Sequence, residues 1–317
     1  MGERSGQKEN GRQATNAQEL HVSEVLYGVR GSNVHPRLRV YRGQSNGRGW
    51  ELWLRTPPPA LAGLVSGLWA GDSEADSAFH SMLPDGELWM MFNLGPPQLV
   101  SGEVYRTTLM CGLQEGPVGF ASTIRHPCCV SVRFRPLGAW TFFGGLPLTE
   151  MANQVVDLES VLGGRAGVEP LRQRLMDCPS LGAALDLLEN WLVERLLGGP
   201  TAHPVTLAAL DSLAAQNGSA RVATVARDVG VSSRHLNGLF HREIGLPAKS
   251  FMRILRFQRA LDGLCSPANP DLATLAQDCG YYDQAHMNLD FRDLAGMTPT
   301  EYAARVYQLP GWREIGG

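Results

Sequence analysis

Apolar residues recur at helical spacing twice within residues 221–305, and the two runs follow the same order. The first run has apolar side chains at i, i+3, i+4 and i+7, namely Val222, Val225, Ala226 and Val229. Gly230 interrupts this helix, and Ser232 begins a second one. The second run has Leu272, Leu275, Ala276 and Cys279, followed by Gly280 and Asp283. The pattern predicts two helix-turn-helix units joined by a linker.

The two units align along their whole length. An offset of 50 pairs Ala226 with Ala276 before the turn, and an offset of 51 pairs Phe240 with Phe291 after it. A helical bundle that repeats by chance is the alternative. Such a bundle gives no reason for alanine, glycine and a polar cap to recur in this order, so we interpret the region as an internal repeat.

The residues at each turn have a physical reason to be there. Gly230 and Gly280 can adopt the positive φ angle that other residues resist. Ser232 and Asp283 can accept hydrogen bonds from the free amides at the start of the next helix. That second helix keeps one apolar face on the core of its unit, and its other face is free to enter a major groove.

Two more helices and a capping box complete this region. Residues 202–216 are expected to form its first helix, and residues 248–264 a linker helix roughly 25 Å long. A rigid helix of that length can hold two recognition helices about 34 Å apart, which is one turn of DNA. Thr298, Pro299 and Glu301 fit a capping box with proline in the first helical position.

Upstream, from residue 50 to residue 135, the pattern favours strands. One segment alternates two sets of side chains, Leu88, Met90, Phe92 and Leu94 against Trp89, Met91 and Asn93. A second alternates Val130, Val132 and Phe134 with Ser131, Arg133 and Arg135. Proline and glycine turns separate such segments, which predicts a small antiparallel barrel or sandwich.

Helical spacing returns between these strands and the repeat. Residues 168–176 and 181–197 have apolar residues at i, i+3 and i+4, and Gly198-Gly199-Pro200 ends the second helix. These helices could pack on the barrel, on the C-terminal helices or on a second subunit. We expect packing within the chain.

Residues 221–305 resemble the DNA-binding domain of the AraC family of bacterial transcriptional regulators. The segments that carry the resemblance are VATVARDVGVSSRHLNGLF, PAKSFMRILRFQRAL and LATLAQDCGYYDQAHMNLDFRDLAGMTPTEY. The segments LPDGELWMMFNL and VSVRFRPLGAWTFFGGLPLTEM resemble the cupin-like sensor domain at the amino end of some of these regulators.

The resemblance and the patterns together imply an α+β protein. Its N-terminal part is a small antiparallel β-barrel or sandwich with helices, and its C-terminal part is an all-α double helix-turn-helix domain. We expect a disordered polar tail at 1–20, a cupin-like sensor domain at 21–165, connecting helices at 166–200 and the DNA-binding domain at 201–309.

Polar side chains opposite the apolar face of each second helix are candidates for contact with double-stranded DNA. Arg234 can bond guanine and Asn237 adenine, each by paired hydrogen bonds. By resemblance, positions 234, 237 and 238 are the family's base-reading positions, although Gly238 lacks the long polar side chain that relatives often carry. In the second unit, Leu289 stands where many relatives have arginine, so base reading by this helix is either weak or rests on an apolar contact with a thymine methyl group. The full candidate set is Ser233, Arg234, Asn237, Gly238, His241, Arg242, Lys249, Arg253, Arg256, Gln284, Ala285, Asn288 and Arg292.

The formal net charge of −3 gives little support for a nucleic-acid partner, but the charge is uneven. Between positions 234 and 259 the basic residues are Arg234, Arg242, Lys249, Arg253, Arg256 and Arg259, against Glu243 alone. Between positions 262 and 301 the only arginine or lysine is Arg292. The acidic residues in this range are Asp262, Asp271, Asp278, Asp283, Asp290, Asp293 and Glu301. We therefore expect the first unit and the linker helix to attract phosphates, and the second unit to position the domain.

Candidate ligand-binding residues in the predicted barrel are His80, Trp89, His126 and Arg133. Cys128 and Cys129 are adjacent, so on a strand they point to opposite faces and do not ligate together. The sequence has no His-x-His run and no Cys-x-x-Cys pair. We expect no metal site, no cofactor and no catalytic residue.

The sequence also indicates where in the cell the protein is located. The first 20 residues are polar, and no run approaches the roughly 18 apolar residues of a membrane span. The six cysteines are scattered over the chain, without the density of a disulfide scaffold. We expect a cytoplasmic protein without a signal peptide and without a membrane partner.

The leading hypothesis is a sequence-specific transcription factor, not an enzyme, that is controlled by a small-molecule effector or by a homodimer formed through the barrel. If it activates transcription, RNA polymerase is a further partner. One alternative is a DNA-repair alkyl-transfer enzyme with this type of DNA-binding domain, which would need an activated cysteine. Another is an orphan regulator whose barrel binds a protein partner.

Overall fold

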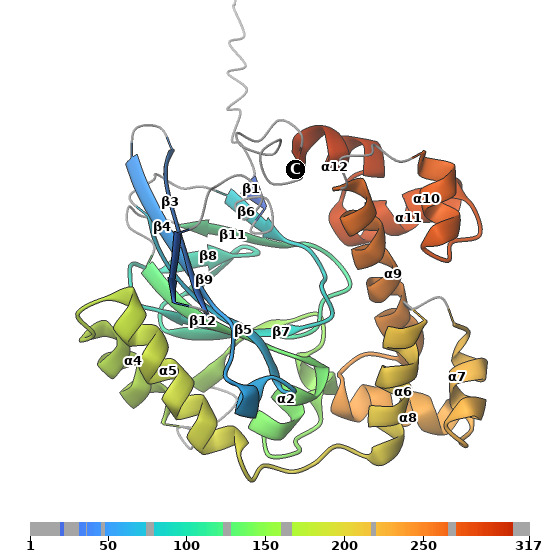
Figure 1. Cartoon of the computed structure of the whole chain (residues 1–317), viewed down its shortest axis with the longest axis horizontal. Coiled ribbons are helices and arrows are strands. Elements are labelled where there is room, and N and C mark those ends of the chain that lie inside the picture. Colours follow the sequence, from blue (N-terminus) through green and yellow to red (C-terminus); the bar gives the residue numbers. More distant parts are fainter. Residues whose placement is uncertain are drawn as a thin grey trace, which may run out of the picture.

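A computed structural model shows an α+β protein with an N-terminal antiparallel sheet domain and a C-terminal all-helical domain (Figure 1). The structure describes residues 20–21, 32–35, 37–45, 48–73, 79–122, 128–159, 167–216, 220–265 and 271–306. Most of the expected tail lies outside these residues. Among the described helices, none has both the length and the apolar character needed to cross a membrane.

The described strands of the N-terminal domain form two sheets. The larger has the order β13-β10-β7-β12-β5-β4-β3-β2, and its strand pairs are antiparallel. Its strands are β2 (Ser32–His35), β3 (Leu38–Ser45), β4 (Arg48–Arg55), β5 (Val65–Ser73), β7 (Leu88–Asn93), β10 (Thr108–Cys111), β12 (Cys128–Phe134) and β13 (Val155–Asp157). The smaller sheet has the order β1-β6-β11-β8-β9, with β1 parallel to β6 and the other pairs antiparallel. Its strands are β1 (Leu20–His21), β6 (Phe79–Met82), β8 (Gln98–Val100), β9 (Glu103–Tyr105) and β11 (Val118–Ser122).

The alternation predicted for residues 88–93 separates two apolar cores, because β7 is buried on both faces. Leu88, Met90 and Phe92 join the large core on the outer face of the eight-stranded sheet. Trp89 and Met91 join a smaller core with residues of both sheets. The interior between the sheets is therefore lined by large apolar side chains.

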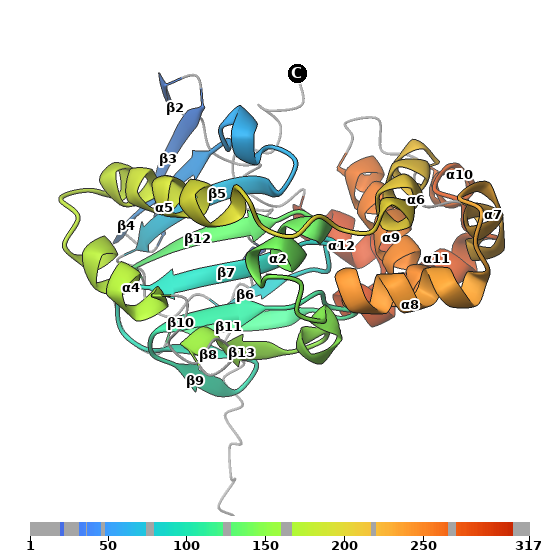
Figure 2. The same ribbon diagram turned by 90° about the horizontal axis from the view of Figure 1, so that it is seen from below.

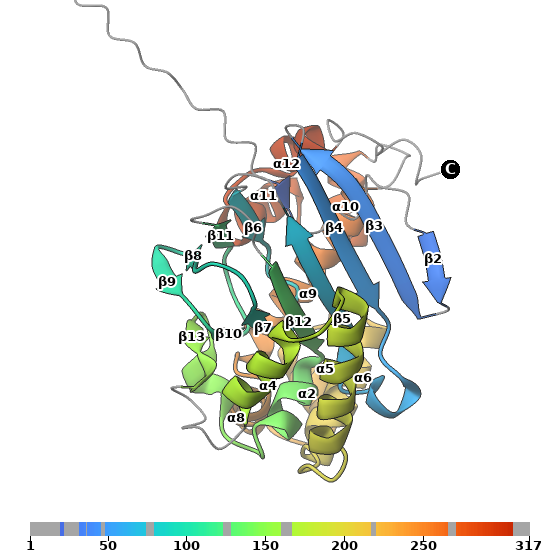
Figure 3. The ribbon, with the colours of Figure 1, turned by 90° about the vertical axis from the view of Figure 1, so that its left-hand side faces the viewer.

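The outer face of the eight-stranded sheet is covered by helices (Figures 2 and 3). These are α4 (Val168–Met176) and α5 (Leu181–Leu196), which agree with the predicted segments within a residue. Ser180 Oγ accepts a hydrogen bond from Ala183 N (3.2 Å) and so caps α5. Because α5 contacts β5, β12 and β4, these helices pack on the sheet of their own chain.

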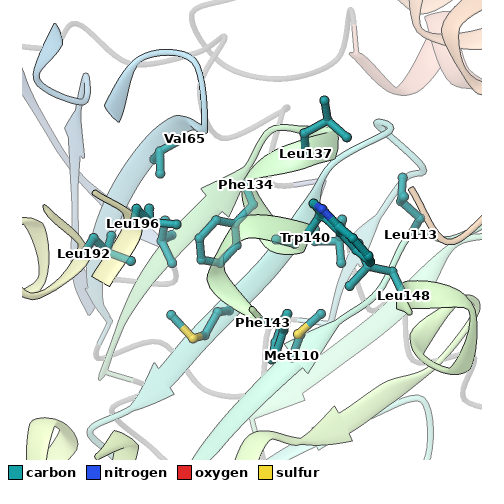
Figure 4. Packing of buried hydrophobic residues seen from close by; sticks show 14 of the residues in the cluster. Val65, Met110, Leu113, Phe134, Leu137, Trp140, Phe143, Leu148, Leu192 and Leu196 are labelled. Atoms are coloured by element: carbon teal, nitrogen blue, oxygen red, sulfur yellow. The ribbon is translucent and has the colours of Figure 1, made fainter. Parts of the chain in front are cut away.

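Short helices add to this core. They are η1 (Pro59–Leu61), α2 (Pro136–Phe142) and η2 (Leu148–Met151). Figure 4 shows part of the cluster, from Leu192 and Leu196 on α5 to Trp140 on α2 and Leu148 on η2. The same cluster continues into the helical domain.

In the described part of the C-terminal domain, every regular element is a helix. The first three are α6 (Pro204–Ala215), α7 (Val222–Asp228) and α8 (Ser233–Glu243). The linker helix is α9 (Ala248–Leu264), with the bounds that the pattern predicts. The second unit is α10 (Leu272–Asp278) and α11 (Gln284–Ala295), followed by α12 (Pro299–Val306). Figure 1 shows α9 running between the two groups of helices.

Candidate nucleic-acid interface

The two helix-turn-helix units close their turns with the same hydrogen bonds. Val231 N donates to Ala226 O (2.9 Å) in the first, and Tyr281 N donates to Ala276 O (2.9 Å) in the second. The intervening glycines have φ angles of +75° and +81°. Ser232 Oγ accepts from His235 N (3.2 Å), and Asp283 Oδ1 accepts from His286 N (2.8 Å), so both predicted caps are present. The repeat in the sequence is therefore also a repeat in the structure.

On α8, the apolar residues of the sequence pattern are buried and most DNA candidates are exposed. Leu236 and Phe240 are fully buried, whereas Arg234 and His241 are exposed. Ser233 is half-buried at the start of the helix, and Gly238 is exposed. A Cβ atom at Gly238 would meet nothing within 4 Å, so this helix face is open to an approaching base edge.

Asn237 has a structural partner that the sequence did not indicate. Its Oδ1 atom accepts a hydrogen bond from Ala248 N (3.1 Å), which is one of the free amides at the start of α9. A paired contact with adenine uses the same oxygen as an acceptor. Base recognition by Asn237, which remains a prediction, would therefore have to share this oxygen with the cap of the linker helix.

Two basic candidates flank this face. Lys249 is exposed near the start of α9. Arg242 is exposed, pairs with Glu243 (2.7 Å), and has its guanidinium carbon 5.9 Å from the ring centroid of Trp140 in the N-terminal domain. Lys249 is thus open to a phosphate, and Arg242 is partly engaged by the sheet domain.

The second unit presents a more apolar and acidic surface. Ala285 and Arg292 are exposed, and Gln284 and Asn288 are half-buried. Leu289 is 59% exposed and Tyr282 is 88% exposed. His286 Nδ1 accepts from Tyr282 N (3.4 Å), and Tyr281 is buried. Tyr281 therefore belongs to the core of the second unit, whereas Tyr282 lies on its surface.

Arg253 and Arg256, the remaining candidates on α9, lie against α11. Arg253 Nε donates to Asp290 Oδ1 (2.6 Å), and Arg253 Nη2 donates to Asp293 Oδ2 (2.5 Å). Arg256 Nη2 lies 3.9 Å from Asp290 Oδ2, and its guanidinium is 5.5 Å from the ring of Tyr281. Both side chains face carboxylates of the second unit, so their predicted contact with phosphate would compete with these pairs.

In the N-terminal domain, two of the four ligand candidates come together. The Arg133 guanidinium lies 4.5 Å from the ring of Trp89, and Arg133 pairs with Asp85 (2.5 Å) and Glu87 (2.9 Å). Trp89 Nε1 donates to Asp85 Oδ2 (3.0 Å). The backbone of His80 lies in β6, but its side chain lies outside the described residues, as does all of His126.

Cys111 and Cys128 lie in environments that suppress the reactivity of a thiol. Burial raises the pKa of Cys111 to about 12 and that of Cys128 to about 11. A thiol with so high a pKa is protonated at neutral pH and is a poor nucleophile. Within the described part of the chain, no three His, Cys, Asp or Glu side chains are grouped so that they could hold a metal ion.

Contacts between the two domains were not foreseen from the sequence. Thr149 Oγ1 donates to His241 O (2.6 Å) at the end of α8, and Gln258 Nε2 on α9 donates to Pro84 O (2.5 Å). A Cβ atom at Gly245, where φ is +99°, would lie 3.1 Å from Leu148 O. A glycine at this position was a visible signal, but nothing in the sequence indicated its neighbour.

Comparison with known families gives two matches. Residues 225–305 match a helix-turn-helix domain family, and residues 55–157 match a domain of unknown function, DUF6597. The first match extends from α7 to α12 and so includes both units. No curated protein matches the chain.

Solved structures show further similarities. An AraC-type regulator from Chromobacterium violaceum is 25% identical over 33% of this chain and 94% of its own, with a TM-score of 0.31. A probable AraC family regulator from Rhodopseudomonas palustris CGA009 is 25% identical over 33% of this chain and 98% of its own, with a TM-score of 0.30. ToxT from Vibrio cholerae O395 is 11% identical over 74% of this chain and 98% of its own, with a TM-score of 0.40.

Proposed function

We propose that the first helix-turn-helix unit makes the dominant DNA contacts of this chain, which is a DNA-binding transcriptional regulator of the AraC family, a family of transcription factors and not of enzymes. The observation that carries this proposal is the open face of α8. Arg234 and His241 are exposed there, and the backbone at Gly238 is accessible. Lys249 at the start of α9 extends the basic surface.

The second unit contributes less attraction for DNA. Exposed acids surround α11, among them Asp278, Asp283 and Asp293, and each of them repels phosphate. Leu289 offers an apolar contact that fits a thymine methyl group. In this proposal the first unit supplies affinity, and the second adds a weaker specificity one turn of DNA away.

The test is selection of binding sites from a random duplex pool with the full chain, followed by affinity measurements across a salt series. We expect Arg234→Ala to weaken binding by about 1–3 kcal/mol and to relax preference at one base pair, because an arginine–guanine pair is lost. Arg39→Ala is the matched control, since it removes an exposed arginine from β3 of the sheet domain. Equal affinity of wild type and Arg234→Ala would contradict the proposal.

We further propose that the sheet domain controls the DNA-binding domain through the contacts at α8 and α9. Thr149 holds the end of α8, and the turn at Pro84 is bonded to α9. Asp85 and Glu87 in that turn pair with Arg133 inside the sheet domain. A small-molecule effector that disturbed this cluster would move a segment bonded directly to the linker helix.

Screening of compounds by thermal unfolding tests for an effector. A ligand at about 100 times its dissociation constant adds roughly 2.7 kcal/mol to the free energy of unfolding. Dimerisation through the sheet domain is the other form of control, and analytical ultracentrifugation with and without DNA measures it. If the regulator activates transcription, RNA polymerase is an additional partner.

A further inference from the structure

A group of charged side chains joins the linker helix to the second recognition helix. Arg253 and Arg256 are three residues apart on α9, so they share one face, as do Asp290 and Asp293 on α11. Arg253 bonds both carboxylates, Asp290 at 2.6 Å and Asp293 at 2.5 Å. The Asp290 side chain is only 7% exposed, and that of Arg253 is 25% exposed. A carboxylate this deeply buried requires a charged partner.

The internal repeat shows that these acids are specific to the second unit. The offset of 51 aligns Asp290 with Leu239, which is buried in the first unit, and Asp293 with Arg242. The aromatic packing of the two units is alike, since Phe240 lies against Phe251 (6.0 Å between centroids) and the aligned Phe291 lies against Tyr302 (6.4 Å). The second unit therefore has ionic bonds where the first has a leucine and an outward arginine.

We infer that Arg253 is a positioning residue that fixes the orientation of α11 on the linker helix, and that it does not contact DNA phosphate. The inference rests on the proposed function, in which both units face DNA. Its two bonds are to carboxylates three residues apart along α11, a separation of about 4.5 Å along the helix axis. Two bonds at that separation resist rotation and tilt of α11, which one contact cannot do.

Charge balance supports the same conclusion. The two arginines and two aspartates of the cluster have no net formal charge. A guanidinium that already donates to two carboxylates has few N–H groups free for a phosphate, because its donors are fixed in one plane and each bond occupies one of them. The cluster thus sets the angle between the two recognition helices, and with it the spacing of the two DNA half-elements that the protein accepts.

The experiment uses the full chain and two variants. Arg253→Met with Asp290→Leu replaces the buried pair by apolar residues, leucine being the residue at the aligned position of the first unit, so the fold is kept. Asp293→Asn weakens only the exposed bond, because that carboxylate is 63% exposed. For both we expect loss of preference in one half-element and tolerance of altered half-element spacing. The double variant removes one positive and one negative charge, so it should leave the dependence of affinity on salt unchanged.

Lys249→Met provides the contrasting control on the same helix. We expect it to lower the slope of log affinity against log salt by about 0.9 while the preferred bases and spacing stay the same, as for a lost phosphate contact. If the Arg253→Met variant with Asp290→Leu behaved like Lys249→Met, the inference would be overturned.

A measurement without DNA separates this inference from the proposed function. Amide hydrogen exchange should show at least tenfold faster exchange in α11 of both variants, with α8 unchanged. Equal exchange in α11 of wild type and variants would refute the positioning role whether or not DNA is bound. A wild-type protein that selects no DNA sequence would refute the proposed function alone.

Discussion

The carboxylate of Glu87 lies beside the guanidinium of Arg133 and accepts a hydrogen bond from Ser66 Oγ (2.5 Å). Burial raises the pKa of this carboxyl, and the attraction of Arg133 and the bond from Ser66 only partly offset that effect. The folded protein therefore binds the proton of Glu87 more readily than the unfolded chain does. Ionised Glu87 opposes folding at neutral pH.

This shift predicts a pH dependence of stability. As pH falls through the raised pKa of Glu87 toward its ordinary value of 4.5, the folded state takes up the proton first, so the contribution of Glu87 becomes more favourable. Glu87→Gln should lack this contribution. Urea unfolding of wild type and variant between about pH 8 and about pH 5 measures it, and the difference in unfolding free energy should change across this range. If the unfolding free energies of wild type and variant changed in parallel with pH, burial would not control the pKa of Glu87.

At the scale of secondary-structure elements, α8 combines a well-formed cap with a weak centre. Ser232 caps its first turn, and Leu236 and Phe240 anchor it to the core. Gly238 lies in the middle of the helix, where glycine is about 1 kcal/mol less favourable than alanine. Because it has no side chain, the same glycine leaves the outer face of the helix open.

We predict that Gly238→Ala raises the free energy of unfolding by about 0.5–1 kcal/mol, because alanine costs less backbone entropy in a helix and the added Cβ meets nothing within 4 Å. Gly138→Ala in α2 is the contrasting variant. Its Cβ would lie 1.8 Å from Leu64 O, a backbone atom that cannot move aside, so it should destabilise the protein. Thermal unfolding should show that Gly238→Ala is more stable than wild type and that Gly138→Ala is less stable. A destabilised Gly238→Ala would contradict the expectation.

At the scale of the whole molecule, one apolar cluster runs from the sheet domain into the helical domain. It includes Phe134 and Trp140 on one side and Phe240 and Phe251 on the other. Two hydrogen bonds reinforce the contact, from Thr149 and from Gln258. The DNA-binding domain therefore packs against the sheet domain through α8 and α9, the helices that also carry its basic surface.

If this packing restrains the DNA-binding domain, weakening it should tighten DNA binding. Thr149→Val with Gln258→Met removes both hydrogen bonds and keeps the size of each side chain. At about 1 kcal/mol for each bond, DNA affinity should rise by up to roughly thirtyfold. The control is Gln114→Met, which removes bonds within the sheet domain to Gly112 and Gln154. Unchanged affinity of the double variant would exclude restraint by this interface.

Local patterns were sufficient for the helical domain. The bounds of α9, the caps at Ser232 and Asp283 and the capping box of Thr298 and Glu301 all follow from residues within a few positions of one another. Spacing of i, i+3 and i+4 and the needs of helix ends are properties of a short segment, so the chain alone expresses them. The division into a sheet domain and a helical domain followed in the same way.

The partners of the charged side chains depended on the folded chain. Arg253 and Asp290 are 37 residues apart in the sequence, and Gln258 and Pro84 are 174 residues apart. The composition of α9 indicates a basic helix, but whether an arginine on it faces phosphate or a buried carboxylate depends on which helix crosses it. The offset that aligns Asp290 with Leu239 was visible in the sequence, and only packing of α11 on α9 gives the buried acid its partner.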